Sequence, residues 1–114
     1  AEVEFMHELG ITQEIVSIAS KRVEGAKVKR IVLEIGKLTA VLPDALRFCF
    51  ELVSEGTPLE GAELEIRELP GRAQCLECGN ELLLDRPFGR CECGNTFMKW
   101  LSGEELKIKE LELL

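Results

Sequence analysis

The sequence predicts an α+β fold, a small mixed β-sheet with two helices that is interrupted near its end by a turn-rich insert. Two segments carry apolar residues at three- and four-residue steps, the period of an amphipathic helix. Three others are short and either β-branched or strictly alternating, as strands are. A chain of 114 residues has room for one core and at most a small second module.

The two helices have recognisable ends. The first is expected over residues 9–23, where isoleucines recur at helical steps and Gly25 follows as a stop signal. The second is expected to begin at Pro43, because proline suits the first helical turn, and to stop at Gly56. Cys49 falls on the apolar stripe of this second helix, which indicates an inert buried thiol.

Three strands are expected around these helices. Residues 28–35 are β-branched and end at Gly36, which indicates a mostly buried strand. Residues 62–69 alternate strictly, as in a strand with one face in the core. Residues 105–113 also alternate, but the pattern slips by one residue between Ile108 and Leu111, where we expect a bulge or a strand end.

The insert separates the last two strands. Residues 70–100 follow neither period, and they contain several Gly and Pro turn signals and four of the five cysteines. Because an alternating strand lies on each side of the insert, the chain is expected to leave the sheet after one strand and return with the next. The predicted domains are therefore 1–69 together with 101–114, and 70–100.

Composition and charge exclude several classes of protein. The chain has 46% hydrophobic and 31% charged residues, the balance of a soluble globular protein, and no apolar run long enough to cross a bilayer. Its first residues, AEVEF, are acidic where a signal peptide is basic. We therefore expect a cytoplasmic protein without a membrane partner. A net charge of −7 also argues against a nucleic-acid partner, since Lys and Arg supply most of that affinity.

The cysteines of the insert have the spacing of a metal site. They occur as CLECGN at 75–80 and CECGN at 91–95, with twelve residues between the pairs. Two such pairs on facing turns supply the four thiolates of a tetrahedral Zn²⁺. The glycine that follows each pair allows the backbone to curl around the metal. Cys75, Cys78, Cys91 and Cys93 are thus the predicted zinc ligands, and the insert is a predicted zinc ribbon.

Two alternatives for these cysteines are weaker. Disulfides are rare in a reducing compartment. A redox C-x-x-C motif belongs at the start of a helix, whereas this pair lies in a turn-rich loop. Four thiolates leave no open coordination position, so the predicted zinc is structural rather than catalytic. The second pair has one residue between its cysteines instead of two, which requires a tighter turn with fewer amide hydrogen bonds.

The sequence lacks the usual signs of an enzyme. It has neither G-x-x-x-x-G-K-[ST] nor G-x-G-x-x-G, so it has no evident means of holding a nucleotide. A Cys–His nucleophile pair would have to join Cys49 to His7, the only histidine. Because Cys49 is expected to be inert, the sequence predicts no catalytic residues. A lone histidine is itself more often a residue without a chemical role than a functional one.

Several segments together carry a resemblance to a known family. These are MHELGITQEIV at 6–16, RIVLEIGKLTAVLPDALRFCFELVSEGT at 30–57, EGAELEI at 60–66, the paired cysteines and SGEELKIKELEL at 102–113. In order and without large gaps, they resemble the hydrogenase maturation factor HypA/HybF family. The resemblance implies a nickel metallochaperone, with a small α/β nickel-binding domain and an inserted zinc domain.

The resemblance also implies a role for the single histidine. The nickel site of the family is a Met-His-Glu motif, which falls here on Met6, His7 and Glu8. Nickel would bind a ring nitrogen of His7 and the backbone amides of His7 and Glu8, since Ni²⁺ favours nitrogen-rich sites. Five residues precede Met6, so it has no free α-amine, which some members use as a further ligand.

The cofactors and partners implied are those of metal delivery. Ni(II) is a transient cargo and Zn(II) a structural ion. The partners are a HypB-type GTPase, the [NiFe]-hydrogenase large subunit and, in some organisms, urease accessory proteins. The main rival hypothesis is a zinc-ribbon interaction module that binds a protein partner and carries no nickel.

Overall fold

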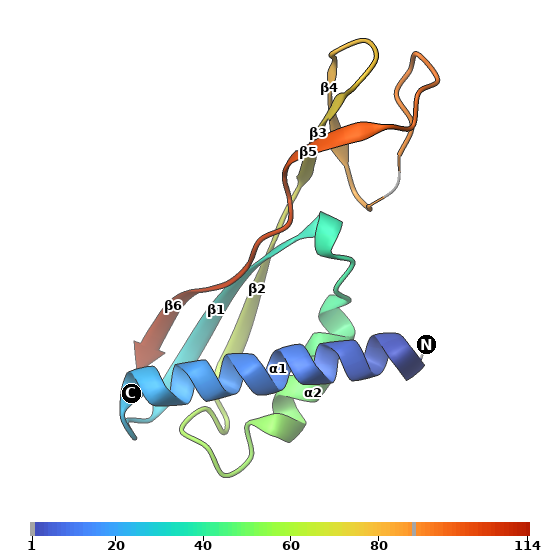
Figure 1. Cartoon of the computed structure of the whole chain (residues 1–114). Coiled ribbons are helices and arrows are strands. Elements are labelled where there is room, and N and C mark those ends of the chain that lie inside the picture. The colour runs from blue at the N-terminus through green and yellow to red at the C-terminus, as the bar shows by residue number, and fades with distance from the viewer. Residues whose placement is uncertain (1, 88) are drawn as a thin grey trace. The chain divides into compact units, whose positions relative to one another are not determined.

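The computed structural model describes residues 2–87 and 89–114, with only the backbone described for residues 2–6. Within these residues the chain forms two α-helices and six strands, whose arrangement can be followed in Figure 1. Their order along the chain is α1 (Glu2–Val23), β1 (Val28–Gly36), a 3₁₀ turn (Lys37–Thr39), α2 (Pro43–Val53), β2 (Glu63–Leu69), β3 (Gly71–Cys75), β4 (Glu81–Leu84), β5 (Met98–Ser102) and β6 (Leu106–Leu113). The predicted α+β class and the two helices are confirmed.

Helix α1 begins earlier than predicted. It starts at Glu2 and not at residue 9, so His7 and Glu8 lie inside the helix instead of before it. The sequence EVEFMHE contains no glycine or proline to stop helix growth, and acidic residues favour a helix N-terminus. The predicted end is confirmed at Val23, after which Gly25 adopts a φ of 87°.

The first sheet has the strand order β2-β1-β6. Central strand β1 is largely buried, as its β-branched sequence predicts, and Ile31, Leu33 and Ile35 are almost fully covered. Strand β2 was expected to have one face in the core, but its apolar residues are only half-buried. Strand β6 continues through the slip in its alternation without ending there, while the expected bulge stays a prediction.

The insert forms a second sheet of order β4-β3-β5, in which both neighbours run antiparallel to β3. A small apolar core lies on one face, made by Ala73 and Leu84 together with Leu38 from the 3₁₀ turn, with Leu82 and Met98 packed against them. Leu38 also donates its N–H to the Gly103 carbonyl at 2.9 Å. A residue outside the insert therefore completes the core of this sheet.

Contacts divide the chain into two compact units. The first consists of Ala1–Leu33, Val41–Ile66 and Ile108–Leu114, and the second of Glu34–Ala40 and Arg67–Lys107. In the first unit the α1 and α2 helices pack on each other, with Val16, Ala19 and Cys49 buried.

One arginine ties together the three strands of the first sheet. Arg30 of β1 contacts Glu65 of β2 at 2.7 Å, and Glu110 and Glu112 of β6 at 3.1 and 3.2 Å. Each flanking strand thus supplies a carboxylate to the central one. The polar positions of these alternating strands therefore link neighbouring strands as well as contacting solvent.

Candidate metal centres

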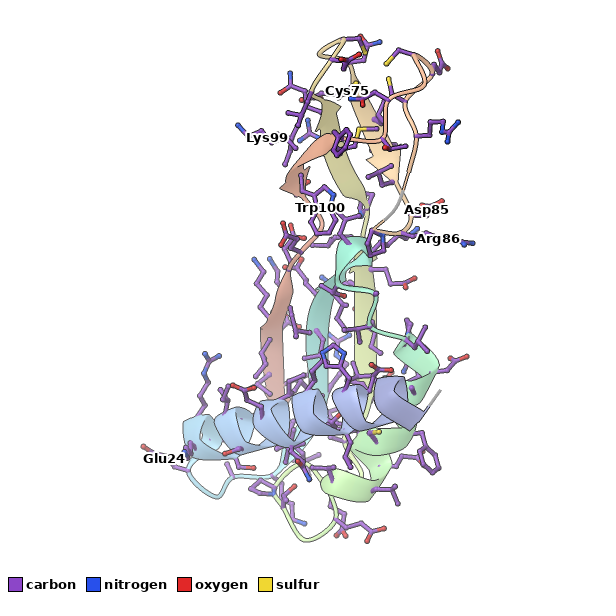
Figure 2. All side chains as sticks on the ribbon, turned by 45° about the vertical axis from the view of Figure 1, so that its right-hand side comes forward. Glu24, Cys75, Asp85, Arg86, Lys99 and Trp100 are labelled. Carbon is purple, nitrogen blue, oxygen red and sulfur yellow. The ribbon has the colours of Figure 1, made fainter. Side chains whose placement is uncertain are left out.

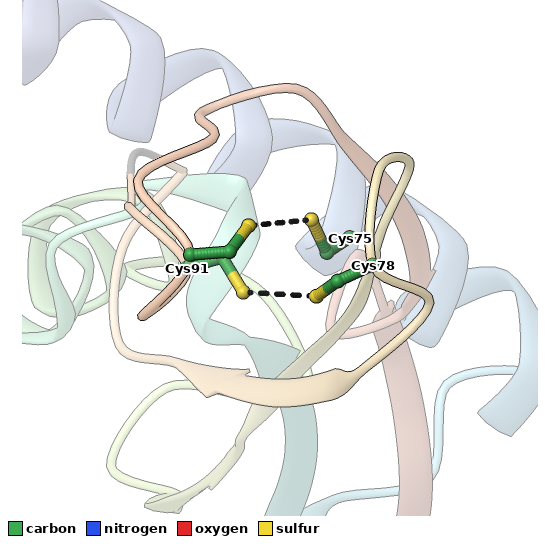
Figure 3. A group of neighbouring side chains, drawn as sticks. Cys75, Cys78 and Cys91 are labelled. Atoms are coloured by element: carbon green, nitrogen blue, oxygen red, sulfur yellow. Dashed lines mark hydrogen bonds between the residues drawn. The ribbon is translucent and has the colours of Figure 1, made fainter.

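The four cysteines of the insert come together at one end of the second sheet. Cys75 is the last residue of β3, Cys78 lies in the turn that follows, and Cys91 and Cys93 lie in the loop between β4 and β5. Their sulfur atoms all lie within 4.8 Å of one another. Cys75 faces Cys93 at 3.7 Å between sulfurs, and Cys78 faces Cys91 at 3.4 Å (Figure 3).

These distances fit a tetrahedral metal ion. Zn–S bonds of about 2.3 Å give a tetrahedron with S–S edges of about 3.8 Å. Both measured pairs lie close to that edge, and none of the sulfurs forms a disulfide. The four predicted zinc ligands are therefore brought together as a metal-binding cluster. A bound Zn²⁺ would link the β3 end of the sheet to the loop between β4 and β5.

Both cysteine turns use glycine as the sequence predicts. Gly79 and Gly94, each directly after a cysteine pair, have φ angles of 78° and 96° in the left-handed region. In the first turn the Gly79 N–H donates to the Cys75 carbonyl at 3.0 Å. In the second the Gly94 N–H donates to the Cys91 carbonyl at 2.8 Å, one residue sooner. The second hydrogen bond closes a turn that is one residue shorter, which is the tighter turn expected from the C-x-C spacing.

Hydrogen bonds prepare one thiol in particular for metal binding. The backbone N–H of Cys78 and the side-chain amide of Asn95 donate to the Cys75 sulfur, and they lower the pKa of Cys75 to about 6. The Asn95 nitrogen lies 3.5 Å from that sulfur, and its oxygen accepts the Phe97 N–H at 3.3 Å. A thiolate is the metal-binding form of cysteine, so Asn95 favours coordination.

Sequence reasoning did not identify Asn95. The signal available was the repeated Cys-Gly-Asn, which places Asn80 and Asn95 at equivalent positions after the two pairs. Among the described residues, the side chain of Asn95 contacts a cysteine of the other pair, Cys75, and Asn80 has no equivalent contact. No pattern within the sequence distinguishes the two asparagines.

The predicted burial of Cys49 is confirmed. It is fully buried on α2, and burial followed by the nearby charge of Glu8 raises the pKa of its thiol. The His7 side chain is exposed on α1, whereas the Cys49 thiol is buried on α2.

The two residues predicted at the nickel site, His7 through its ring and Glu8 through its backbone, have side chains in different environments. The His7 ring is 58% exposed, whereas the Glu8 side chain is only 1% exposed, with 3.7 Å between His7 Nδ1 and Glu8 Oε1. Thr12 Oγ1 donates to the Glu8 carbonyl at 2.6 Å within the helix. The His7 ring is therefore open to a metal ion, while the Glu8 carboxylate lies inside. The Met6 side chain is outside the described residues.

No helix in the described part of the chain is long and apolar enough to cross a bilayer.

Comparison with known proteins identifies the family. Residues 6–113 match the family described as "Hydrogenase/urease nickel incorporation, metallochaperone, hypA". The hydrogenase maturation factor HypA of Nostoc sp. strain PCC 7120 is 60% identical, and the alignment covers 95% of this chain and 96% of that protein. The HypA of Geobacter metallireducens is 48% identical, with 95% and 99% covered.

Solved structures share the fold. The solution structure of the Ni metallochaperone HypA from Helicobacter pylori superimposes with a TM-score of 0.64, covering 94% of this chain and 97% of that one at 22% identity. A second solution structure of a HypA protein superimposes with a TM-score of 0.63, covering 96% of this chain and 97% of that one at 25% identity. Fold, metal-binding cysteines and sequence agree: the chain belongs to the HypA family of metallochaperones for nickel incorporation into hydrogenase and urease, a family of metal carriers and not of enzymes.

Proposed function

We propose that this chain binds Ni(II) at Met6, His7 and Glu8 and delivers it to the [NiFe]-hydrogenase large subunit. The observation that carries the proposal is that the family match begins at Met6, directly before the only histidine of the chain. That histidine is exposed, as a cargo site must be if the metal is to be handed on. Nickel favours nitrogen ligands, and the imidazole supplies one.

The remaining nickel ligands are proposed to be backbone nitrogens. The buried carboxylate of Glu8 leaves its main chain as the accessible donor, together with the main chain of His7. Both residues lie within α1, where each N–H beyond the first four donates to a carbonyl of the preceding turn. Nickel binding through these amides therefore requires the first two turns of α1 to open. Opening is feasible because helix ends fray at low free-energy cost.

The four-cysteine cluster is proposed to hold a structural Zn(II). Four thiolates fill the tetrahedron, so neither water nor substrate can reach the metal. The ion would stabilise a unit whose own apolar core is small. Residues 1–69 and 101–114 are then the proposed nickel-binding domain and 70–100 the zinc-binding domain. The two compact units of the fold are defined by contacts between residues and not by bound metals. The division into a nickel-binding and a zinc-binding domain therefore stays a prediction.

Delivery is proposed to depend on partners. The sequence has no phosphate-binding loop, and so a HypB-type GTPase would supply the nucleotide-driven step. The large subunit of [NiFe]-hydrogenase would receive the metal, as would urease accessory proteins in organisms that have them. The proposed setting is the cytoplasm.

Calorimetric titration of the zinc-loaded protein with Ni²⁺ tests the proposal. The His7→Ala variant should lose nickel binding and keep its zinc. Gln13→Ala, an exposed polar change on the same helix, is the matched control and should bind nickel as the parent chain does. Unchanged nickel binding by His7→Ala would favour the rival zinc-ribbon interaction module.

A further inference from the structure

The outer edge of β5 is an open strand edge in the second unit. Strand β5 (Met98–Ser102) pairs only with β3 in the sheet order β4-β3-β5, so no described strand covers its other side. Natural proteins usually protect such edges with charges, prolines or bulges, because an open edge pairs readily with another chain. This edge has one charge, Lys99, and a register shift opposite Arg72 and Ala73, but it also carries large apolar side chains: Trp100 is 39% exposed, and Phe97, directly before the strand, is 72% exposed.

The hydrogen-bond register shows which backbone groups face outward. The Leu76 N–H donates to the Phe97 carbonyl at 3.1 Å, so these two residues form a hydrogen-bonded pair. Such pairs alternate along an antiparallel ladder. Met98 and Trp100, opposite Cys75 and Ala73, therefore direct their own N–H and C=O groups away from β3. These groups are placed to bind the backbone of an added strand.

A pocket lies beside the same edge. It has a volume of about 520 Å³, and its lining is formed by β5 together with the loop between β4 and β5: Pro87, Gly89, Thr96, Phe97, Met98 and Trp100. Met98 and Trp100 share the sheet face that carries Ala73. The pocket, called here the β5 pocket, thus presents an apolar surface to every second residue of a strand laid along β5.

Three cationic residues are neighbours in sequence of residues that line the β5 pocket. Lys99 points to the opposite face of the sheet from Met98 and Trp100, because side chains alternate along a strand. Arg86 and Arg90 stand directly before and after the segment that supplies Pro87 and Gly89. All three cations are exposed, and among residues 2–87 and 89–114 no ion pair within 4 Å involves them. Figure 2 marks Lys99 and Trp100 on β5 and Arg86 after β4.

We propose that the outer edge of β5 binds an extended segment of a partner protein in which apolar and acidic residues alternate, adding it to the sheet beyond β5. Backbone hydrogen bonds to Met98 and Trp100 would hold the segment in register. Its apolar side chains would enter the β5 pocket, and its acidic side chains on the other face would meet Lys99. Pairing of this kind takes its affinity from the main chain and its specificity from alternate side chains. Binding of such a segment would not require nickel.

Trp100 makes the proposal measurable, because the chain has one tryptophan and no tyrosine. We would titrate the zinc-loaded full chain with a capped peptide of alternating valine and glutamate and follow the tryptophan emission. A saturable blue shift is expected as the indole loses water. A peptide of the same composition with its valines and glutamates in separate blocks should bind at least about tenfold more weakly.

Charge reversal supplies the matched control. Lys99→Glu should weaken binding of the acidic peptide about tenfold and create binding of an alternating valine and lysine peptide, a gain that a misfolded variant cannot give. Lys109 is an exposed lysine on β6, and Lys109→Glu should change the binding of neither peptide. No emission shift at millimolar peptide, or equal binding by Lys99→Glu, would overturn the proposal. So would a concentration-dependent shift without peptide, since the occupant would then be a second copy.

Discussion

Nδ1 of His7 lies 3.7 Å from Oε1 of Glu8, although one side chain is exposed and the other is buried. The Glu8 carboxylate lies close enough to Cys49 of α2 for its charge, after burial, to raise the pKa of that thiol. The Glu8 side chain therefore lies near α2, whereas the side chain of the adjacent His7 on the same helix is exposed to solvent. Two adjacent residues of the proposed nickel motif thus differ in exposure, one side chain buried and the other open to solvent.

Opening of α1 should accompany nickel binding. If the His7 and Glu8 amides become ligands, the first two turns cannot stay helical, and the far-UV circular dichroism at 222 nm should lose part of its helical signal on saturation with Ni²⁺. The His7→Ala variant should show no such loss. A chain that begins at Met6 should bind nickel at least about tenfold more tightly, because it has fewer helical bonds to break and gains an α-amine. Unchanged helicity at nickel saturation would exclude the backbone ligands.

The Glu8→Gln variant should show whether nickel binds the carboxylate of Glu8 or its backbone amide. Because the carboxylate is buried, nickel affinity should change less than about threefold in this variant, measured by calorimetry. Glu8→Ala should instead lower the stability of the protein by about 1–3 kcal/mol, since it removes a buried side chain between two helices. Thermal unfolding of both variants checks this. Loss of nickel binding in a folded Glu8→Gln protein would mean that the carboxylate is a direct ligand.

Zinc retention should depend on pH and on Asn95. The folded-state pKa of Cys75, about 6, lies below that of a free thiol, so this thiolate stabilises the folded unit above the free pKa. Its contribution is lost as the pH falls through about 6. Asn95→Ala removes a donor to the sulfur, so transfer of zinc to a colorimetric chelator should begin about half a pH unit higher. Asn80→Ala, at the equivalent place in the first turn, should leave the transfer profile unchanged.

Gly36→Ala should strongly destabilise the second unit. A β-carbon at Gly36 would collide with the backbone carbonyl of Gly103, and backbone has little freedom to move aside. We expect a loss of more than about 3 kcal/mol, or failure to fold, in chemical denaturation followed by Trp100 emission. The matched control is Gly10→Ala on α1, where a β-carbon meets open space and should add about 0.5–1 kcal/mol of stability. Equal stability of the two variants would contradict this close approach.

The features predicted best from the sequence are those that a short segment determines without distant contacts. The cysteine cluster followed from spacing within two turns, and the end of α1 followed from Gly25. The start of α1 was missed because apolar periodicity marks only the part of a helix that packs on a core. Leu38 and Asn95 could not be found from local pattern. Their roles depend on residues 35 and 20 positions away, such as Ala73 for Leu38 and Cys75 for Asn95.

The participation of Leu38 in the core of the second sheet limits how this protein can be taken apart or recombined. A peptide of residues 70–100 would lack that side chain and would present Ala73 and Leu84 to water. Grafting the insert into another host would require a leucine-sized residue at the matching place in the host loop. Among relatives, substitutions at position 38 should therefore be correlated with substitutions at position 84, because the two side chains share one small core.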